Sequence, residues 1–205
     1  MICREEEAKM KRTDILSFAN SLSGETGYCE VLNIYNSQKT LPRNYAVRLN
    51  DPWCATFVSA CFLKFGYDAI SECSCNEMIK KAQKAGIWVE DDSYKPSIGD
   101  VLMYDWQDNG KGDNHGTPDH VGIIIGISDT TITVREGNKS SSIGNRSVPI
   151  NGKYIRGFIT PPYEAASHLD LIIERIAGVD INTLYKKSGA SGVTNEMIRI
   201  VKEGY

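Results

Sequence analysis

The sequence has little that would suit a membrane protein or a general nucleic-acid binder. No apolar run approaches the roughly 20 residues that a membrane-spanning helix needs. The formal net charge is −3, and no segment concentrates the basic residues that a nucleic-acid-binding face requires. We therefore expect neither a membrane span nor a nucleic-acid partner.

The sequence also suggests neither a secretion signal nor a disulfide framework. The first residues, MICREEEAKMKRTD, lack the apolar core of a signal peptide. We therefore expect synthesis in the cytoplasm without a signal peptide, so that any action outside the cell needs another release route. Because cytoplasmic thiols stay reduced, the six cysteines are expected to be free.

Paired metal ligands are scarce. Cys73 and Cys75 lie close together, but no second cysteine or histidine pair completes a zinc set, and there are only three histidines. The Asp- and Asn-rich segment 105–113 lacks the bidentate glutamate of an EF-type calcium loop. We expect no metal and no cofactor, and we interpret residues 73–75 as a polar turn before a helix starting near Asn76.

What is present is a soluble-type composition, with helical patterns first and strand patterns afterwards. Apolar residues make up 41% of the chain and charged residues 24%. This order predicts an α+β domain with a mainly antiparallel sheet, spanning residues 1–163 with its core at 14–163. The expected helices are 14–22, 29–36, 53–65 and 76–85, and the expected strands are 87–92, 99–106, 120–127, 131–138 and 154–160.

The last part of the chain has a different pattern. After Pro161 and Pro162, residues 164–205 read as three short helices. A piece of about 40 residues rarely folds alone without staples. We expect it to dock on the main domain or to form a small appended module, with its role left open.

Two cysteines share the segment DPWCATFVSACF. Cys61 falls in the middle of the expected helix among apolar residues, where a thiol behaves as a small, inert hydrophobe. Cys54 falls in the first turn, where free N–H groups and the helix dipole favour a thiolate and can bind an oxyanion. Position alone does not make Cys54 a nucleophile, because it also needs a base.

His120 is the candidate base. It opens the first strand of a predicted hairpin, HVGIIIGI-SDT-TITVREGN. Opposed residues of an antiparallel pair point to the same face of the sheet. If Ile124 and Ile132 share a face, the residue numbers of each opposed pair must therefore add up to an even number. His120 then lies opposite Glu136 or Asn138, and all three point to one face. An imidazole beside a carboxylate and an amide is the arrangement that a cysteine nucleophile needs.

Each of these signals is weak alone. A histidine at a strand end is often an ordinary polar edge residue, and Glu-Gly-Asn after a strand is a common turn. His115 is a rival base, but it lies in the Gly- and Asp-rich loop, where nothing fixes its orientation. The combination of Cys54, His120 and a facing Glu136 or Asn138 is more specific than its parts.

Four segments in order, DPWCATFVSACF, IGDVLMYDW, DHVGIIIGI and VREGN, resemble a CHAP domain, a cysteine- and histidine-dependent amidohydrolase or peptidase. The resemblance covers residues 14–163. It implies a papain-like α+β fold related to NlpC-type peptidases, and a substrate in peptidoglycan. Many members of the family are phage or prophage endolysins, or lysins of virions and conjugation systems.

The resemblance also implies residue roles. Cys54 would be the nucleophile, His120 the general base and then acid, Glu136 the orienting carboxylate and Asn138 a supporting residue. The Cys54 N–H would hold part of the oxyanion. The expected substrate-binding residues, along the groove, are Trp53, Trp106 and Asp119, with a packing role for Trp106 as an equal alternative.

Two features depart from relatives. Some relatives bind calcium just before the nucleophile, but that region has only Asp51 here, so no such site is expected. The papain-type oxyanion glutamine is also absent, and Asn50 or Tyr45 could take its place.

Three functions remain in view. The first is a monomeric peptidoglycan amidase or endopeptidase that reaches the wall by holin-type, phage- or conjugation-associated release. The second keeps the cysteine chemistry on a non-wall substrate, as an intracellular amidase or a toxin. The third is a non-catalytic wall-binding module, against which the intact set of Cys54, His120, Glu136 and Asn138 argues.

Overall fold

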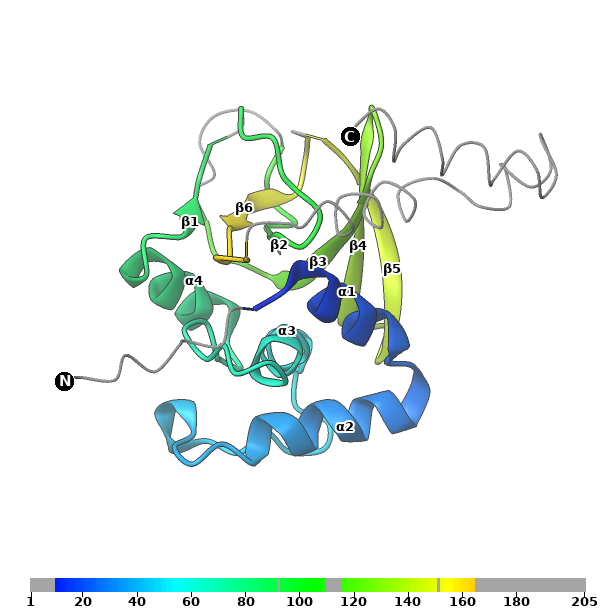
Figure 1. Ribbon diagram of the computed structural model, residues 1–205. Helices are drawn as coiled ribbons and strands as arrows, with labels where there is room; N and C mark the ends of the chain where they lie inside the picture. Colours follow the sequence, from blue (N-terminus) through cyan, green and yellow to red (C-terminus); the bar gives the residue numbers. More distant parts are fainter. Residues whose placement is uncertain (1–9, 92, 110–115, 151, 165–205) are drawn as a thin grey trace, which may run out of the picture.

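The computed structural model describes residues 10–91, 93–109, 116–150 and 152–164 (Figure 1). Helices come first and a six-stranded antiparallel sheet follows, so the predicted α+β class is confirmed. The helices are α1 (Arg12–Ser21), α2 (Gly24–Asn36), the short 3-10 helix η1 (Pro42–Asn44), α3 (Cys54–Leu63) and α4 (Cys75–Lys84). The strands are β1 (Trp88–Val89), β2 (Val101–Tyr104), β3 (His120–Ile127), β4 (Thr131–Lys139), β5 (Ser142–Pro149) and β6 (Ile155–Ile159).

The sheet has the order β1-β6-β2-β3-β4-β5, and every neighbouring pair is antiparallel. Its two faces bury different sets of side chains. Val101, Val121 and Ile123 face the helices, whereas Leu102 and Ile124 join a second apolar cluster on the other face. This alternation is the period-2 pattern that buries both faces of a strand.

Helix α3 is the central helix of the domain. It lies between α2 and the strands β3 and β4 (Figure 1). Every residue from Cys54 to Phe62 is buried, including Thr56 and Ser59. A helix that is buried all round is held from several sides, so its first turn has a fixed position in the molecule.

Helix α2 and strand β5 differ most from the sequence-based expectation. Helix α2 begins at Gly24, five residues before the expected start, and a Cβ on Gly27 in its first turn would lie only 3.0 Å from Ile143 and 3.1 Å from Leu22. Strand β5 was not predicted. Its residues SIGNRSVP are mostly exposed or half-buried, so they lack the apolar alternation that marks a strand, and their pairing with β4 makes them one.

The body of the domain extends to the last described residues. Glu164 donates its N–H to Met10 O at 3.0 Å, and the hydroxyl of Tyr163 donates to Gly99 O at 2.7 Å. The three helices expected in 164–205 fall almost wholly outside the described residues, as does His115.

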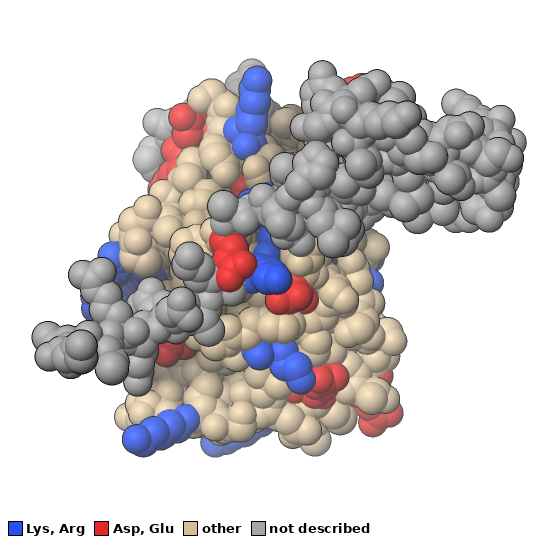
Figure 2. All heavy atoms as spheres, viewed as in Figure 1, with Lys and Arg blue, Asp and Glu red and all other residues tan. Residues whose placement is uncertain are grey.

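The visible surface carries charge of both signs. Basic and acidic side chains are interleaved on the face shown in Figure 2, without a large patch of one sign on its described part. No helix of the described segments has the length and apolar character needed to cross a membrane.

Candidate active site

Cys54 is the first residue of α3, as the sequence predicted. Trp53 precedes it in a non-helical conformation and supplies no side-chain cap. The N–H groups of the first turn therefore remain available, and that of Ala55 hydrogen-bonds the Cys54 sulfur and stabilises its thiolate. The residue is 8% exposed, so its sulfur lies in a desolvated position at the edge of the core.

His120 is the first residue of β3 and pairs with Tyr104 of β2. It is also only 8% exposed. Its Nε2 lies 3.2 Å from Glu136 Oε2, although not along a hydrogen-bond direction. Since Nε2 faces Glu136, Nδ1 is the nitrogen left for the hydrogen bond between the imidazole and Cys54.

The register of the β3–β4 hairpin explains this placement. Near the site Ile124 pairs with Val134, which is the even sum expected from the sequence. A bulge between Ile124 and Gly126 then shifts the register by one, so that Ile127 pairs with Ile132 at the turn. The predicted register is therefore confirmed at the end of the hairpin near His120. The bulge near the turn was not predicted.

Glu136 is completely buried and is held by three neighbours. The hydroxyl of Tyr104 donates to Oε1 at 2.6 Å, and Arg146 Nε lies 2.8 Å from Oε1 and 3.1 Å from Oε2. Burial opposes ionisation of this carboxyl, but the adjacent imidazole of His120 and the hydrogen bonds from Arg146 and Tyr104 outweigh it and lower its pKa. Glu136 is therefore a carboxylate fixed beside the imidazole.

Cys54 and His120 form a thiolate–imidazolium pair. A hydrogen bond from Cys75 is the largest effect on Cys54, and together with His120 it overcomes burial and lowers the Cys54 pKa to about 5. Burial opposes the charge of His120, but its hydrogen bond with Cys54 and the adjacent carboxylate of Glu136 raise its pKa to about 9. At neutral pH Cys54 is therefore mainly a thiolate and His120 mainly an imidazolium.

An aromatic and cationic wall covers the imidazole. Trp106 stacks on Tyr104 with ring centroids 4.8 Å apart and on His120 at 6.1 Å. The guanidinium of Arg146 lies over the Trp106 ring at 4.9 Å. Asp119 Oδ2 accepts the Trp106 N–H at 2.8 Å, so Asp119 fixes the backbone that carries this ring. The side chain of Trp106 is 36% exposed, which leaves part of it open to a ligand.

Two expected site residues are placed differently. Trp53 was expected to contact substrate, but it is 4% exposed and packs its ring against Tyr28 with centroids 4.7 Å apart. It is a core residue that supports the site from beneath. Asn138 is half-buried in a left-handed conformation, with φ of 58°, and makes no hydrogen bond with His120 in the described structure. Of Glu136 and Asn138, Glu136 is the one with a described contact to the imidazole.

The segment before Cys54 does not offer a free oxyanion donor from Tyr45. The Tyr45 hydroxyl donates to Asp51 Oδ2 at 2.7 Å, and the N–H of Arg48 donates to the same oxygen at 2.8 Å. Asn50 is exposed, with φ of 74°. The donor with the clearest position is therefore the N–H of Cys54 itself, in the first turn of α3.

Sequence reasoning missed Tyr104, Arg146 and Cys75. Tyr104 could have been found by pairing the predicted strand 99–106 with the start of β3, since Tyr104 lies opposite His120. Arg146 lies on the strand that was not predicted, and pairs there with Val134. Cys75 was interpreted as part of a polar turn, but α4 begins at this residue and buries it.

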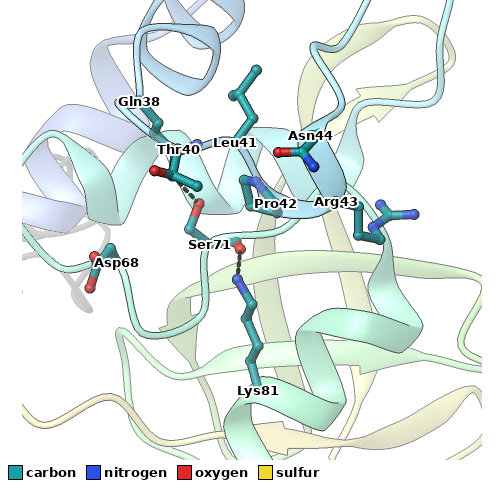
Figure 3. Close-up of a pocket in the computed structure, with 9 residues that line it drawn as sticks. All are labelled: Gln38, Thr40, Leu41, Pro42, Arg43, Asn44, Asp68, Ser71 and Lys81. Carbon is teal, nitrogen blue, oxygen red and sulfur yellow. Dashed lines mark hydrogen bonds between the residues drawn. The ribbon is translucent and has the colours of Figure 1, made fainter.

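Two surface cavities lie beside the segment that precedes Cys54. One of about 260 Å³ is lined by residues next to Cys54 and Cys75, among them Pro52 and Ser74. The other, of about 390 Å³, shares Arg43 with the first and is shown in Figure 3. Its lining residues are Gln38, Thr40, Leu41, Pro42, Arg43, Asn44, Asp68, Ser71 and Lys81.

No cluster of three or more His, Cys, Asp or Glu side chains with metal-binding geometry occurs in the described segments. The five cysteines there are all free thiols. Cys61 is fully buried in α3, and burial raises its pKa, so it packs as the sequence predicted.

A thiol at a helix N-terminus, an imidazole at a strand start and a buried carboxylate are the groups that cysteine-dependent amidohydrolases and peptidases use. Residues 45–138 match the family model of the CHAP domain, so this segment of the chain is similar to that family. It holds the whole Cys54, His120 and Glu136 set. No curated protein and no solved structure matches the chain.

Proposed function

We propose that this protein hydrolyses an amide bond of peptidoglycan, as an N-acetylmuramoyl-L-alanine amidase or as a peptidoglycan endopeptidase, with Cys54 as nucleophile. The observation that carries the proposal is the alignment of Cys54, His120 and Glu136 within the segment that is similar to the CHAP domain family. CHAP domains commonly act on peptidoglycan, which supports the choice of substrate.

The first half of the reaction forms an acyl-enzyme. The Cys54 thiolate attacks the amide carbonyl carbon, and the carbonyl oxygen becomes an oxyanion near the Cys54 N–H. The His120 imidazolium donates its proton to the leaving nitrogen, the C–N bond breaks, and the free amine departs. A thioester to Cys54 and a neutral imidazole remain.

The second half regenerates the enzyme. Neutral His120 removes a proton from water, and the resulting hydroxide attacks the thioester carbonyl. The C–S bond breaks, which releases a carboxylic acid and restores the thiolate and the imidazolium. Throughout, Glu136 orients the imidazole and offsets its positive charge, while Tyr104 and Arg146 hold Glu136 in place.

The groove residues would contribute to binding. The exposed edge of Trp106 offers a flat surface for a sugar ring or for the apolar part of a stem peptide, and Asp119 fixes that surface. The cavity of about 260 Å³ next to Pro52 and Ser74 would accept a neighbouring part of the substrate.

The test is digestion of purified peptidoglycan by the wild-type protein and by the Cys54→Ala variant, with mass spectrometry of released fragments. We expect fragments from the wild type only. New amino termini within stem peptides would identify an endopeptidase, and stems freed from muramic acid would identify an amidase. Cys29→Ala removes an exposed cysteine and should digest the wall like the wild type.

Other outcomes would redirect the proposal. If several wall types stay intact while small amides or peptides are cleaved in a Cys54-dependent way, the substrate lies outside the wall. If Cys54→Ala digests the wall as well as the wild type does, Cys54 is not the nucleophile. Wall binding without any cleavage by the wild type would favour a binding module.

A further inference from the structure

Cys75 lies beside the nucleophile, although the two residues are far apart in the chain. Its Sγ is 3.8 Å from Cys54 Sγ, within the distance of a hydrogen bond between sulfur atoms. Cys54 begins α3 and Cys75 begins α4, so two helix N-termini meet at this sulfur pair. Cys75 is 9% exposed, nearly as buried as Cys54.

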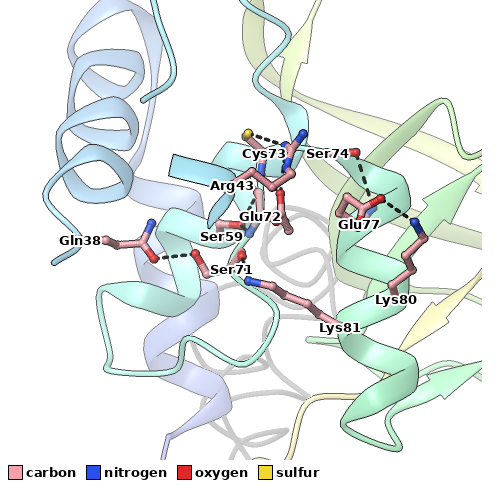
Figure 4. A network of polar contacts seen from close by, with 10 residues as sticks. All are labelled: Gln38, Arg43, Ser59, Ser71, Glu72, Cys73, Ser74, Glu77, Lys80 and Lys81. Carbon is pink, nitrogen blue, oxygen red and sulfur yellow. Dashed lines mark hydrogen bonds and ion pairs between the residues drawn. The ribbon is translucent and has the colours of Figure 1, made fainter. Parts of the chain in front are cut away.

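The segment before α4 is fixed to α3, so the approach of the two sulfurs is held by other contacts. The Ser59 hydroxyl of α3 donates to Glu72 O at 2.7 Å and accepts the Glu72 N–H at 2.8 Å. Glu72 Oε2 in turn accepts from Arg43 at 3.1 Å and from the Cys73 N–H at 3.0 Å (Figure 4). The clasp between Ser59 and Glu72 sits three residues before Cys75.

The start of α4 is also capped. Ser74 is the N-cap residue, and its side chain accepts the N–H of Glu77 at 3.5 Å, while Glu77 pairs with Lys80 (Figure 4). The cap fixes the backbone of the first turn, and so sets where the side chain of Cys75 begins.

The surroundings decide which sulfur carries the proton. Cys54 has the imidazole of His120 and the Ala55 N–H as partners, so its thiolate is stabilised. The hydrogen bond to Cys54 and burial raise the pKa of Cys75 well above its usual range, and the charge of Asp119 acts in the same direction. Cys75 therefore remains a thiol, with an S–H to donate.

We propose that Cys75 is a further catalytic residue, whose thiol donates a hydrogen bond to the Cys54 sulfur and holds it as the ready thiolate. The inference rests on the proposed role of Cys54 as nucleophile. The hydrogen bond is strongest to the free thiolate and is released as sulfur becomes the acyl thioester, whose sulfur accepts hydrogen bonds poorly.

This role has a double signature. Removing the donor should raise the pKa of Cys54 by about one unit or more, because hydrogen bonds to charged groups are among the stronger ones. A more basic thiolate is also more nucleophilic, so its limiting rate of alkylation at high pH should rise about threefold per unit. If Cys75 acted only by packing, its removal would not both raise the limiting alkylation rate of Cys54 and move the inflection of its pH profile to higher pH.

The experiment measures the rate of iodoacetamide alkylation of Cys54 against pH, with each cysteine peptide quantified by mass spectrometry under reducing conditions. The variants are Cys75→Ala and Cys75→Val, which both lack a donor but differ in volume, and Cys75→Ser, which keeps one. Cys61→Ala is the matched control, because Cys61 is also a buried thiol but lies in α3. Exposed Cys29 is the internal reference.

We expect the inflection of Cys54 to move to higher pH, with a higher limiting rate, in Cys75→Ala and Cys75→Val. Cys75→Ser should lie between these variants and the wild type, and Cys61→Ala should match the wild type. Either donor-free variant is sufficient if the other fails to fold.

An unchanged inflection in a folded donor-free variant would overturn the role of Cys75, and so would a shift of equal size in Cys61→Ala. These outcomes are distinct from a failure of the proposed function. If wild-type Cys54 itself titrates like exposed Cys29, the nucleophile assignment fails before Cys75 is considered.

Discussion

Glu136 is the residue on which the polar contacts of the site converge. It is fully buried, yet it accepts hydrogen bonds from Tyr104 and Arg146 and lies against His120. A buried carboxylate with such partners is costly to disturb, because removing one partner leaves the others unpaired. The orientation of the imidazole therefore depends on a network that reaches β2, β4 and β5.

Replacing Glu136 by Gln should lower kcat/KM on the order of 10²-fold or more, with a smaller change in KM. The amide cannot offset the imidazolium charge, so the pKa of His120 should fall and the alkaline limb of the pH–rate profile should move to lower pH. The measurement is the pH dependence of fragment release. The control is Glu90→Gln, which removes a carboxylate paired with Arg156. Equal activity of Glu136→Gln and the wild type would contradict this role.

Trp106 is the residue that we propose binds substrate beside His120. Its ring stacks on His120 and is 36% exposed. Trp106→Ala should raise KM for wall fragments by about tenfold, as expected for the loss of an aromatic binding surface. The alkylation rate of Cys54, which needs no wall contact, should change much less. A large loss of Cys54 reactivity with unchanged KM would show that Trp106 only packs.

At the scale of elements, the contact of α3 with β4 sets the distance between nucleophile and carboxylate. Gly137 follows Glu136 directly, and a Cβ there would lie 2.3 Å from Phe57 Cβ and 2.8 Å from Trp53. The backbone of β4 can approach the first turn of α3 only because this residue has no side chain. Trp53 thus acts on the site through packing.

Gly137→Ala should reduce the free energy of unfolding by about 2 kcal/mol, because the added methyl group forces α3 and β4 apart. It should also reduce the reactivity of Cys54. The matched control is Gly126→Ala in β3, where the nearest atom, Thr133 Cβ, is 3.6 Å from the new Cβ. Urea denaturation followed by circular dichroism measures the stability of the two variants, and the alkylation rate measures the reactivity of Cys54. Equal stability of the two variants would contradict the close contact.

Most elements could be predicted from the sequence because their burial leaves a periodic pattern. Strand β3 has the predicted limits, and α3 and α4 differ from prediction by one or two residues. Strand β5 left no such pattern, since it is a mostly solvated edge whose pairing with β4 defines it. Because β5 was not predicted, Arg146, which lies on it and holds Glu136, was missed as well.

The parts of the site that depend on local sequence patterns could be predicted. The helix start gave Cys54, and the hairpin parity gave His120 with Glu136. The meeting of Cys54 with Cys75 depends on how α4 docks on α3, which the Ser59–Glu72 clasp determines and which no local pattern encodes. The burial of Trp53 likewise depends on its packing against Tyr28 from α2.

At the scale of the whole molecule, Cys54 and Glu136 are held by Cys75, Tyr104 and Arg146, which all precede Glu164. The chain up to Glu164 is tied back to Met10. We therefore predict that a chain ending after Glu164 keeps its cooperative thermal unfolding and the alkylation profile of Cys54, compared with the full chain. Loss of Cys54 reactivity on truncation would place part of the catalytic machinery in residues 165–205.

Comparing wall digestion by the same two chains would also assign a role to the last segment. Unchanged Cys54 reactivity with weaker digestion of intact walls would indicate that residues 165–205 contribute to wall binding. Equal digestion by both chains would make this segment dispensable for hydrolysis.

The most direct test of the account is the pH dependence of kcat/KM for amine release from peptidoglycan. Below its pKa of about 5 Cys54 takes up a proton, and above its pKa of about 9 His120 loses one. Since the reaction needs both the thiolate and the imidazolium, the account predicts a bell with limbs near these values and a plateau around neutral pH. A single rise centred between about pH 8 and 9, as for an ordinary thiol, would contradict the ion pair.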